Sequence, residues 1–489
     1  MKIQIRKKIS GAKSLLVGAT LALSAIITSS NIQPVFKEKS AMAKPNIIFI
    51  YSDDQRYNTI HALGDKQIIT PNLDSLVGAG TTFTHAYNMG AWHGAVCVAS
   101  RTMLVTGLPI WKAQQQEKKL AALMANDGFW SQQLKKAGYE TYMTGKWHVG
   151  ADVNKLFDHV IHERPGMPSQ TPKGYNRPLS VSDTAWQPWD EENGGFWKGG
   201  KHWSEVLADD AVGFIDEASK KESPFFMYLA FNAPHDPRQA PKKFVDMYPV
   251  DKIILPDSYL DEYPFKEAMG SGTDLRDEQL APFPRTPYAV KKHIQEYYAS
   301  ITHLDGQIGR ILQALKASGK LENTYVFFTS DHGLAVGHHG LLGKQNMFDH
   351  SVRTPLIVTG PGIPKHEKRD QQVYLQDIMA TTYELAAVAK PEHVFFNSLL
   401  PLIKSKSKIS NYQEIYSCYM DRQRMVRTDR YKLIYYPKIQ KTLLFDLKND
   451  PNEKNDIAGN KQNDALIRNL RTRLISEQKL NGDTLVLKW

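Results

Sequence analysis

Asn46-Ile47-Ile48-Phe49-Ile50-Tyr51, followed by Ser52-Asp53-Asp54, is the segment that indicates the fold of this chain. Its uninterrupted apolar run is typical of a strand that is buried on both faces of a parallel sheet. Adjacent carboxylates repel each other, so Asp53 and Asp54 are costly side by side unless a cation neutralises them. Ligands of open α/β sheets gather beyond the carboxyl ends of the strands, and we therefore expect these aspartates at a functional edge.

The same arrangement recurs along the chain. Lys146 and His148 follow one further apolar segment, His235 follows a second, and Asp331 and His332 follow a third. The predicted strands are Glu140–Thr144, Phe225–Phe231, Thr324–Thr329 and Leu356–Val358. Between them lie helical patterns, the clearest being Glu296–Ser318, with one apolar stripe. This alternation predicts an α/β fold with a mostly parallel sheet sandwiched by helices.

Residues 1–43 resemble a secretory signal peptide. A basic start is followed by the apolar run Ser14–Ile27 and by the small-residue site Ala41-Met42-Ala43. The run is too short and too rich in small residues to span a membrane comfortably. We expect an exported protein, periplasmic or secreted, with no membrane span.

The formal net charge of +10 overstates how basic the exported chain is. Residues 1–43 contain seven Lys or Arg and one Glu, so the remaining residues carry only +4. Such a weak excess argues against a nucleic-acid partner and slightly favours an anionic substrate.

The exported part divides into two predicted domains. Residues 44–404 are expected to form the catalytic domain. Residues 405–489 are expected to form a smaller α+β subdomain, with an antiparallel sheet of short strands within 414–447 and an amphipathic helix around 465–480.

A third signal is Cys97-Val98-Ala99-Ser100-Arg101, followed by Thr106-Gly107. This stretch resembles the type I sulfatase signature, and the resemblance extends over nearly the whole exported chain. It implies an alkaline-phosphatase-like fold. It also implies that Cys97 is oxidised to formylglycine before export, by a formylglycine-generating or an anaerobic maturation enzyme.

The resemblance assigns the remaining site residues by their position in the family pattern. Around one divalent cation, with Ca²⁺ expected and Mg²⁺ or another ion possible, it places Asp53, Asp54, Cys97, Asp331 and His332. His332 departs from the Asn of many relatives, and imidazole is an unusual calcium ligand. The implied catalytic residues are Cys97, Arg101, Lys146, His148, His235 and Lys344.

The resemblance also implies what these residues do to a sulfate monoester. Lys146 and Lys344 would neutralise the sulfate oxygens, and Arg101 would help to polarise the nucleophile. His235 or Lys344 would protonate the leaving sugar oxygen, and His148 would remove a proton when sulfate is expelled. The implied function is hydrolysis of a sulfated carbohydrate.

The substrate is expected to be an algal or marine polysaccharide such as ulvan or carrageenan, or its oligosaccharides. Glycosaminoglycans and choline sulfate stay open. A phosphoester or phosphonate hydrolase of the same superfamily is the nearest alternative function, and a non-catalytic receptor for sulfated glycans is a more distant one.

Two structural alternatives also stay open. Cys97 and Cys418 are the only cysteines and could form a disulfide. Four tryptophans within residues 151–203 could stack on sugar rings or could instead hold a long loop against the body: Trp186, Trp189, Trp197 and Trp203.

Overall fold

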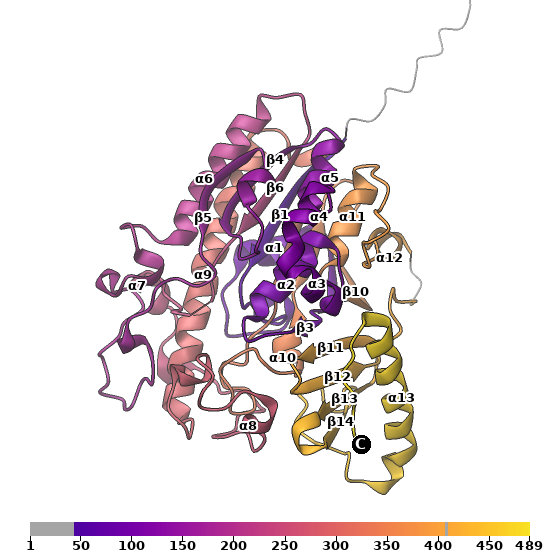
Figure 1. Ribbon diagram of the computed structural model, residues 1–489. Helices are drawn as coiled ribbons and strands as arrows, with labels where there is room; N and C mark the ends of the chain where they lie inside the picture. Colours follow the sequence, from indigo (N-terminus) through magenta and orange to yellow (C-terminus); the bar gives the residue numbers. More distant parts are fainter. Residues whose placement is uncertain (1–43, 406–408) are drawn as a thin grey trace, which may run out of the picture. The chain divides into compact units, whose positions relative to one another are not determined.

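A mixed sheet of nine strands lies at the centre of the chain in the computed structural model (Figure 1). The structure describes residues 44–405 and 409–489, so the predicted signal peptide lies outside the described residues. β1 (Asn46–Ser52) lies between β7 (Thr324–Ser330) and β6 (Phe225–Ala230) and is parallel to both. The strand predicted from the first segment is thus the middle of the sheet.

The other strands extend the sheet on both sides in the order β10-β2-β9-β7-β1-β6-β4-β5, with β8 paired to β2. Most neighbouring pairs are parallel, as predicted, but β9 runs antiparallel to both of its neighbours. Their bounds are β2 Thr81–Tyr87, β4 Glu140–Lys146, β5 His159–Arg164, β8 Arg353–Thr354, β9 Leu356–Thr359 and β10 Glu367–Tyr374.

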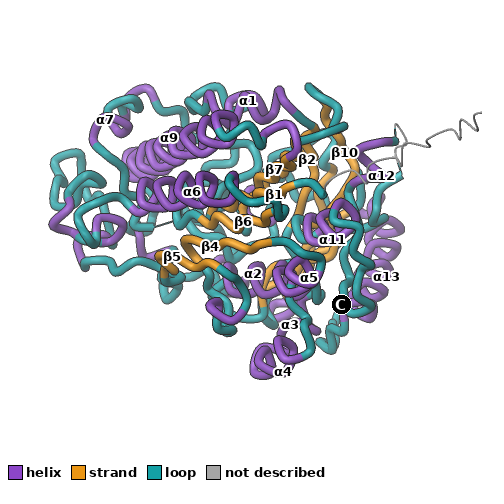
Figure 2. The backbone as a smooth tube through the Cα atoms, turned by 90° about the horizontal axis from the view of Figure 1, so that it is seen from above, coloured by secondary structure: helices purple, strands orange, loops and turns teal. Residues whose placement is uncertain are grey.

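Helices cover both faces of this sheet (Figure 2). Ile48 and Ile50 of β1 pack in one core with α1 (Pro71–Ala79), α6 (Trp203–Ser219) and α9 (Pro287–Ala317). The alternate residues Ile47, Phe49 and Tyr51 belong to the opposite core, because successive strand residues point to opposite faces. That core is covered by α2 (Val96–Thr106), α5 (Trp130–Lys136) and α11 (Asp377–Leu385).

Helix α9 begins nine residues before its predicted start. Thr286 caps it, since its hydroxyl accepts a hydrogen bond of 3.1 Å from the Ala289 N–H, and Pro287 occupies the first turn. Residues 287–292, which precede the apolar stripe, therefore belong to the first turns of a scaffold helix.

Residues 151–203 are not one long loop, because β5 pairs in parallel with β4 along the edge of the sheet. The tryptophans of this region hold it to the body. Trp186 and Trp203 are buried, with the guanidinium groups of Arg177 and Arg164 at 3.8 Å and 4.6 Å from their ring centroids. Their faces are covered by protein, which argues against the sugar-stacking alternative.

The C-terminal residues form the predicted second sheet, in the order β14-β13-β12-β11-β3 (Figure 1). Its strands β11 to β14 are antiparallel, and α13 packs against them. The fifth strand, β3, comes from the catalytic part of the chain. The bounds are β3 Gly90–Ala91, β11 Ile415–Tyr419, β12 Gln423–Arg427, β13 Tyr431–Tyr436, β14 Lys441–Asp446 and α13 Asp464–Asn481.

The remaining helices are short connections. They are α3 Ile110–Gln116, α4 Leu120–Ala125, α7 Lys242–Val245, α8 Lys266–Met269, α10 Asp349–Val352 and α12 Leu400–Lys404. Over residues 44–405 and 409–489, no helix combines the length and the apolar character needed to cross a membrane.

Candidate active site

The carboxyl ends of β1, β4 and β7 bring the predicted charged residues together. The Asp54 N–H donates a hydrogen bond of 3.1 Å to Asp331 Oδ1, and Lys146 Nζ pairs with Asp53 Oδ2. All four side chains are completely buried. The charged residues that the sequence predicted at one edge of the sheet therefore lie close together there.

Cys97 is the second residue of α2, at the end of the helix where free N–H groups favour an anion. Its Sγ lies 3.2 Å from His332 Nε2 and 3.4 Å from Lys344 Nζ. Lys344 reaches the same point from the loop after β7 and donates to both oxygens of Asp54, at 2.8 Å and 2.9 Å. Residues far apart in the sequence thus meet at one sulfur atom.

Arg101 lies one turn further along α2 and is fully buried. Its Nε donates to Asp331 Oδ2 at 3.2 Å, and its Nη1 donates to the Lys146 carbonyl at 2.8 Å. The guanidinium also lies 4.6 Å from the centroid of the Tyr51 ring. Arg101 therefore ties α2 to the ends of three strands, which supports a positioning role for it.

The charges around Cys97 act on its thiol. Burial alone would raise its pKa, but Lys146, Lys344 and His332 outweigh burial and hold the pKa well below its ordinary value. Lowered thiol pKa values are typical of reactive cysteines. Burial also lowers the pKa of His148, so this imidazole is a base that is neutral near pH 7.

Four of the predicted ligands can hold a metal ion. One donor atom from each of Asp53, Asp54, Cys97 and His332 lies within 4.8 Å of the others. Asp53 Oδ1 is buried without a hydrogen-bond partner among the described residues, as expected for an atom that awaits a cation. The carboxylate oxygens of Asp53 and Asp54 suit a hard cation such as Ca²⁺ or Mg²⁺, whereas the Cys97 thiol and the His332 imidazole are softer donors.

Asp331 lies outside that group of four. Its Oδ1 accepts the N–H groups of Asp54 and His332, both at 3.1 Å, and its Oδ2 accepts from Arg101. The structure therefore gives Asp331 contacts that orient its neighbours, and its role as a metal ligand stays a prediction.

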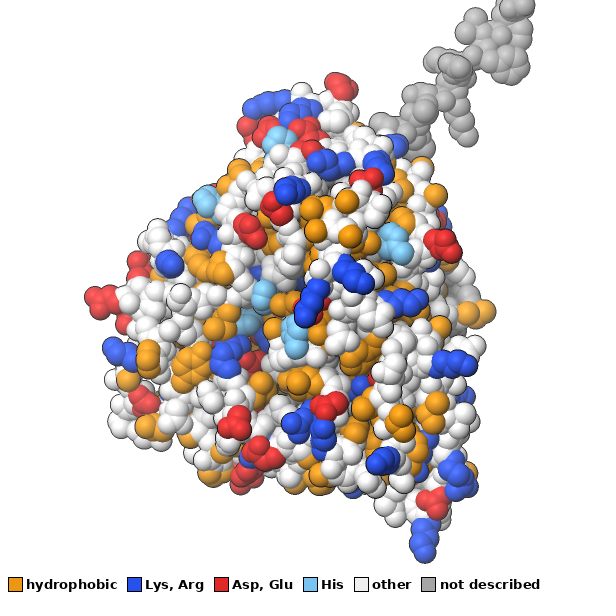
Figure 3. All heavy atoms as spheres, in the orientation of Figure 1, with side chains coloured by type: hydrophobic (Ala, Val, Ile, Leu, Met, Phe, Trp, Pro, Cys, Tyr) orange, Lys and Arg blue, Asp and Glu red, His pale blue; other side chains and the backbone are white. Residues whose placement is uncertain are grey.

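A cavity of about 370 Å³ opens onto Cys97. His148, His235 and Lys344 line it, as the family pattern implies, with His235 Nε2 3.8 Å from Asp54 Oδ2. Basic and histidine side chains gather near the middle of the face that Figure 3 shows.

Sequence reasoning missed four residues of this pocket. Arg276, Asp277 and Gln345 line it, and Asp236 contacts His235 Nδ1 at 3.3 Å. Asp236 directly follows a predicted residue and could have been found by its position. Arg276 and Asp277 lie in a polar stretch that carries no catalytic signal.

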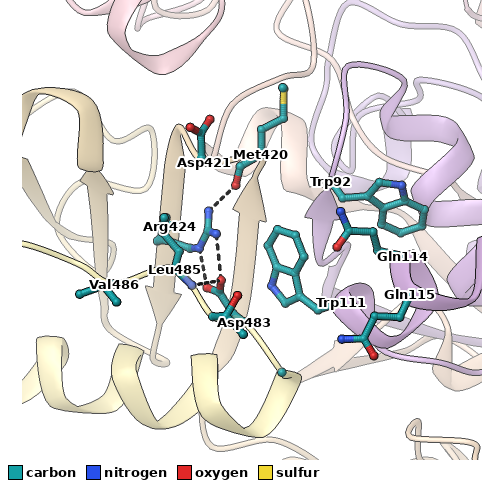
Figure 4. A pocket seen from close by; sticks show the side chains of 12 residues that line it. Trp92, Trp111, Gln114, Gln115, Met420, Asp421, Arg424, Asp483, Leu485 and Val486 are labelled. Atoms are coloured by element: carbon teal, nitrogen blue, oxygen red, sulfur yellow. Dashed lines mark hydrogen bonds and ion pairs between the residues drawn. The ribbon is translucent and has the colours of Figure 1, made fainter.

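A larger groove, of about 520 Å³, lies between α3 and the C-terminal sheet (Figure 4). Trp92 and Trp111 line it, but its central cation is already paired. Arg424 donates to Asp483 at 2.6 Å and to the Met420 carbonyl at 2.6 Å. The smaller cavity, which contains the buried charges and the thiol, is the better candidate for chemistry.

The two cysteines are free and buried, so the disulfide alternative is wrong. Cys418 lies in β11, where burial raises its pKa to about 12 and keeps the thiol unreactive. The opposite pKa shifts separate a reactive cysteine from a structural one.

Two family models together match residues 45–480. The sulfatase family model matches residues 45–388, and the model of the N-sulphoglucosamine sulphohydrolase C-terminal region matches residues 337–480. An arylsulfatase of Clostridium perfringens is 29% identical over 481 residues, which cover 89% of this chain and 94% of the relative. An ulvan-active sulfatase of Formosa agariphila is 25% identical, covering 91% of this chain and 83% of the relative.

Solved structures share the fold at low identity. A structure in complex with its substrate D-glucosamine-2-N,6-O-disulfate is 23% identical and has a TM-score of 0.70, covering 90% of this chain and 99% of that one. A phosphonate monoester hydrolase of Silicibacter pomeroyi is 19% identical and has a TM-score of 0.71, with coverage of 90% and 96%. The alkaline-phosphatase-like architecture expected from the sequence is thus confirmed.

Proposed function

Because this chain belongs to the sulfatase family, we propose that it hydrolyses sulfate monoesters on a carbohydrate, with Cys97 in its formylglycine form as the nucleophile. The observation that carries the proposal is the convergence on Cys97 of His332 at 3.2 Å and Lys344 at 3.4 Å, beside the paired Asp53 and Asp54.

Binding of the sulfate group follows from the charges that face the sulfur of Cys97. Sulfate esters repel anionic nucleophiles, so the sulfate oxygens must meet positive charge before attack. Lys344 lines the cavity, and Lys146, fully buried beside Asp53, also acts on Cys97 by its charge, so both are proposed to supply it. Because these groups are fixed in place before the substrate arrives, little reorganisation is needed during reaction.

Two different histidines fit the two proton transfers. His235 lines the cavity and contacts Asp236, so it can protonate the leaving sugar oxygen, with Lys344 as the alternative donor. His148, with its lowered pKa, is suited to accept a proton when sulfate leaves. The Nδ1 atom of His148 is buried without a partner among the described residues, which leaves it able to accept.

A bound divalent cation and the formylglycine made from Cys97 would complete the site. A divalent cation, for which Ca²⁺ is our choice, would be held by Asp53, Asp54, Cys97 and His332, with Asp331 as the predicted fifth ligand, and would supply positive charge to the sulfate oxygens. The hydrated aldehyde of formylglycine supplies two hydroxyls, one to attack sulfur and one to be deprotonated afterwards.

The substrate class is a sulfated sugar. Support comes from one relative named for ulvan and from a neighbour solved with a sulfated glucosamine. We propose an algal or marine polysaccharide, or oligosaccharides cut from one. We also propose that the chain is exported to the periplasm or beyond, after a maturation enzyme has oxidised Cys97.

Mass spectrometry of the tryptic peptide Gln67–Arg101 tests the nucleophile. We expect an aldehyde in place of the thiol in protein from a host that can oxidise the cysteine. Cys97→Ala should abolish release of sulfate from sulfated oligosaccharides while keeping the thermal unfolding midpoint, because Cys97 is small and its replacement leaves the charge pairs intact. A sample that is active with an unmodified thiol throughout would refute the formylglycine mechanism.

A second candidate function, phosphonate or phosphoester hydrolysis, is favoured by the likeness in fold to the phosphonate monoester hydrolase. Matched aryl sulfate, phosphate and phosphonate esters distinguish the two. We expect sulfate to be released with a kcat/KM at least about 100-fold higher, equivalent to about 2.7 kcal/mol of transition-state stabilisation. A clear preference for phosphorus esters would favour the alternative.

A further inference from the structure

A chain of alternating charges forms the outer wall of the catalytic pocket. Lys344 Nζ lies 4.0 Å from Asp277 Oδ2, and Arg276 Nη2 lies 2.5 Å from Asp277 Oδ1. Arg276 Nη1 pairs in turn with Asp236, whose Oδ1 is 3.3 Å from His235 Nδ1. Arg276 is therefore the link between the two residues proposed to protonate the leaving group.

Of the three central members of this chain, only Arg276 reaches the cavity with a substantial exposed area. The side chains of Asp236 and Asp277 are 3% and 4% exposed, whereas that of Arg276 is 33% exposed. Further bonds hold the carboxylates in place, since Gln170 donates to Asp236 at 2.9 Å and Gln345 donates to Asp277 at 3.0 Å. Nη1 also contacts Met167 Sδ, and Tyr175 interacts with the same guanidinium, so Arg276 is held in a fixed orientation on the pocket wall with a third of its side chain exposed.

The charge of Arg276 is more than balanced by its two partners. Burial alone would raise the pKa of both aspartates, but Arg276 outweighs burial and keeps both pKa values below their ordinary range. The trio therefore carries two negative charges and one positive charge near neutral pH. Met167 and Leu275 also line the pocket, so its outer part offers apolar walls and hydrogen-bond donors but no surplus of positive charge.

We propose that Arg276 is a specificity-determining residue that donates to an uncharged hydroxyl of the sugar ring carrying the scissile sulfate, so that the enzyme favours rings with one sulfate. The inference rests on the proposed function. A second sulfate or a carboxylate on the same ring would lie near this trio, whose net charge is negative, and like charges at an interface disfavour binding. A hydroxyl instead accepts from a guanidinium held in a fixed orientation by two carboxylates.

Steady-state kinetics of Arg276→Gln on two substrates test this role. One substrate is a monosulfated monosaccharide, and the other is 4-nitrophenyl sulfate, which has no ring hydroxyl. Loss of one hydrogen bond to a charged donor should raise the KM for the sugar about 10- to 100-fold with kcat changed less than about 3-fold, while the KM for the aryl ester also changes less than about 3-fold. A fall in kcat for the sugar alone would instead show that Arg276 positions the general acid, because 4-nitrophenolate leaves without protonation. A disulfated monosaccharide should be a poorer substrate than the monosulfated one for the unmodified enzyme, by at least about 10-fold.

Two further variants keep the test decisive. Arg276→Lys retains the positive charge between the buried carboxylates, so the variant should fold. It loses the planar fork, so its KM for the sugar should rise while its KM for the aryl ester stays nearly unchanged. The control is Arg310→Gln. Arg310 lies near the C-terminal end of α9 and pairs with Asp209 of α6, so its replacement should leave the KM for both substrates unchanged.

The possible outcomes distinguish the role of Arg276 from the proposed function. An equal loss on sugar and aryl ester in both Arg276 variants, or a preference of the unmodified enzyme for the disulfated sugar, overturns the role of Arg276 alone. Failure of the unmodified, formylglycine-bearing enzyme to release sulfate from any sugar overturns the proposed function and this inference with it.

Discussion

Two neighbouring carboxylates, each matched by its own lysine, are the most demanding feature of the site. Asp53 pairs with Lys146, and Asp54 pairs with Lys344. Three of these side chains are completely buried, and Lys344 is 4% exposed where it lines the cavity. Taking four charges out of water costs several kcal/mol per ion unless each finds a partner of good geometry. The arrangement is better explained as a binding device for an anion and a cation than as a source of stability.

His332 makes the cation affinity depend on pH. With residue 97 as the cysteine, burial alone would lower the pKa of His332, but the charges of Asp331, Cys97 and Asp54 outweigh burial and raise it to about 9. Since only the neutral imidazole can ligate a metal, binding must displace a proton below that pH. We expect the apparent Ca²⁺ affinity to rise up to about 10-fold per pH unit between pH 6 and 9, as measured by calorimetric titration of the chelator-treated protein.

The variant His332→Asn should keep an oxygen ligand and lose most of this pH dependence. His162→Asn is a matched control, because His162 also pairs with an aspartate, Asp210, but is half exposed on the edge strand β5 and is not a predicted ligand. An unchanged pH slope in His332→Asn would show that another group controls cation binding.

Helix α13 illustrates how a single element is held by its packing. Its apolar residues Ile467, Leu470 and Leu474 face the C-terminal sheet, as the helical spacing of the sequence predicts. Glu477, on the same helix, is half-buried, and burial together with the charge of Glu414 raises its pKa to about 7. Helix α13 therefore carries a carboxyl that folding disfavours when it is ionised.

Removal of that charge should stabilise the protein at alkaline pH. Because the folded-state pKa is raised, Glu477 contributes stability below about pH 4.5 and loses that contribution as pH rises through 7. Glu477→Gln should match the unmodified protein near pH 4.5 and exceed it at pH 8 by about 1 kcal/mol, a value reduced for solvent screening.

Urea unfolding of both proteins at the two pH values measures the difference. Glu384→Gln, which neutralises an exposed residue of α11, is the control and should change little at either pH. A variant that is no more stable at pH 8 than at pH 4.5, relative to the unmodified protein, would contradict the prediction.

At the scale of the whole molecule, direct contacts join the catalytic part of the chain to the C-terminal sheet. Gly90 of β3 has a φ of 88° and pairs with Cys418, so closely that a Cβ atom there would lie 1.8 Å from the Cys418 carbonyl oxygen. Lys432 of β13 is buried against Asp349 at 2.5 Å and Glu453 at 2.6 Å. One hydrophobic core contains residues of both predicted domains.

Because these contacts connect the two predicted domains, we predict that residues 44–404 do not fold alone. Without β13, Asp349 loses Lys432 and a large apolar surface is uncovered, which favours aggregation. We expect that fragment to be insoluble or to lack a cooperative thermal transition and sulfatase activity, in contrast to residues 44–489 prepared in parallel. A soluble and active fragment 44–404 would instead support independent domains.

The local pattern of residues determined the order of the elements. Apolar runs predicted β1, β4, β6, β7 and β9, and helical spacing predicted most of α9 and α13, because periodicity reports which face of an element is buried. The residues at the strand ends, from Asp53 to His332, could be predicted for the same reason, since parallel strands deliver their carboxyl ends to one edge. The sulfatase resemblance then supplied roles for them.

Only the tertiary structure decided the contacts that join distant parts of the chain. Which lysine pairs with which aspartate, how Arg276 connects His235 to Lys344, and whether the tryptophans face sugar or protein all depend on packing between segments far apart in sequence. Side-chain periodicity has a range of a few residues, whereas the charge pairs of this pocket form only after the sheet has assembled and water has been excluded from it.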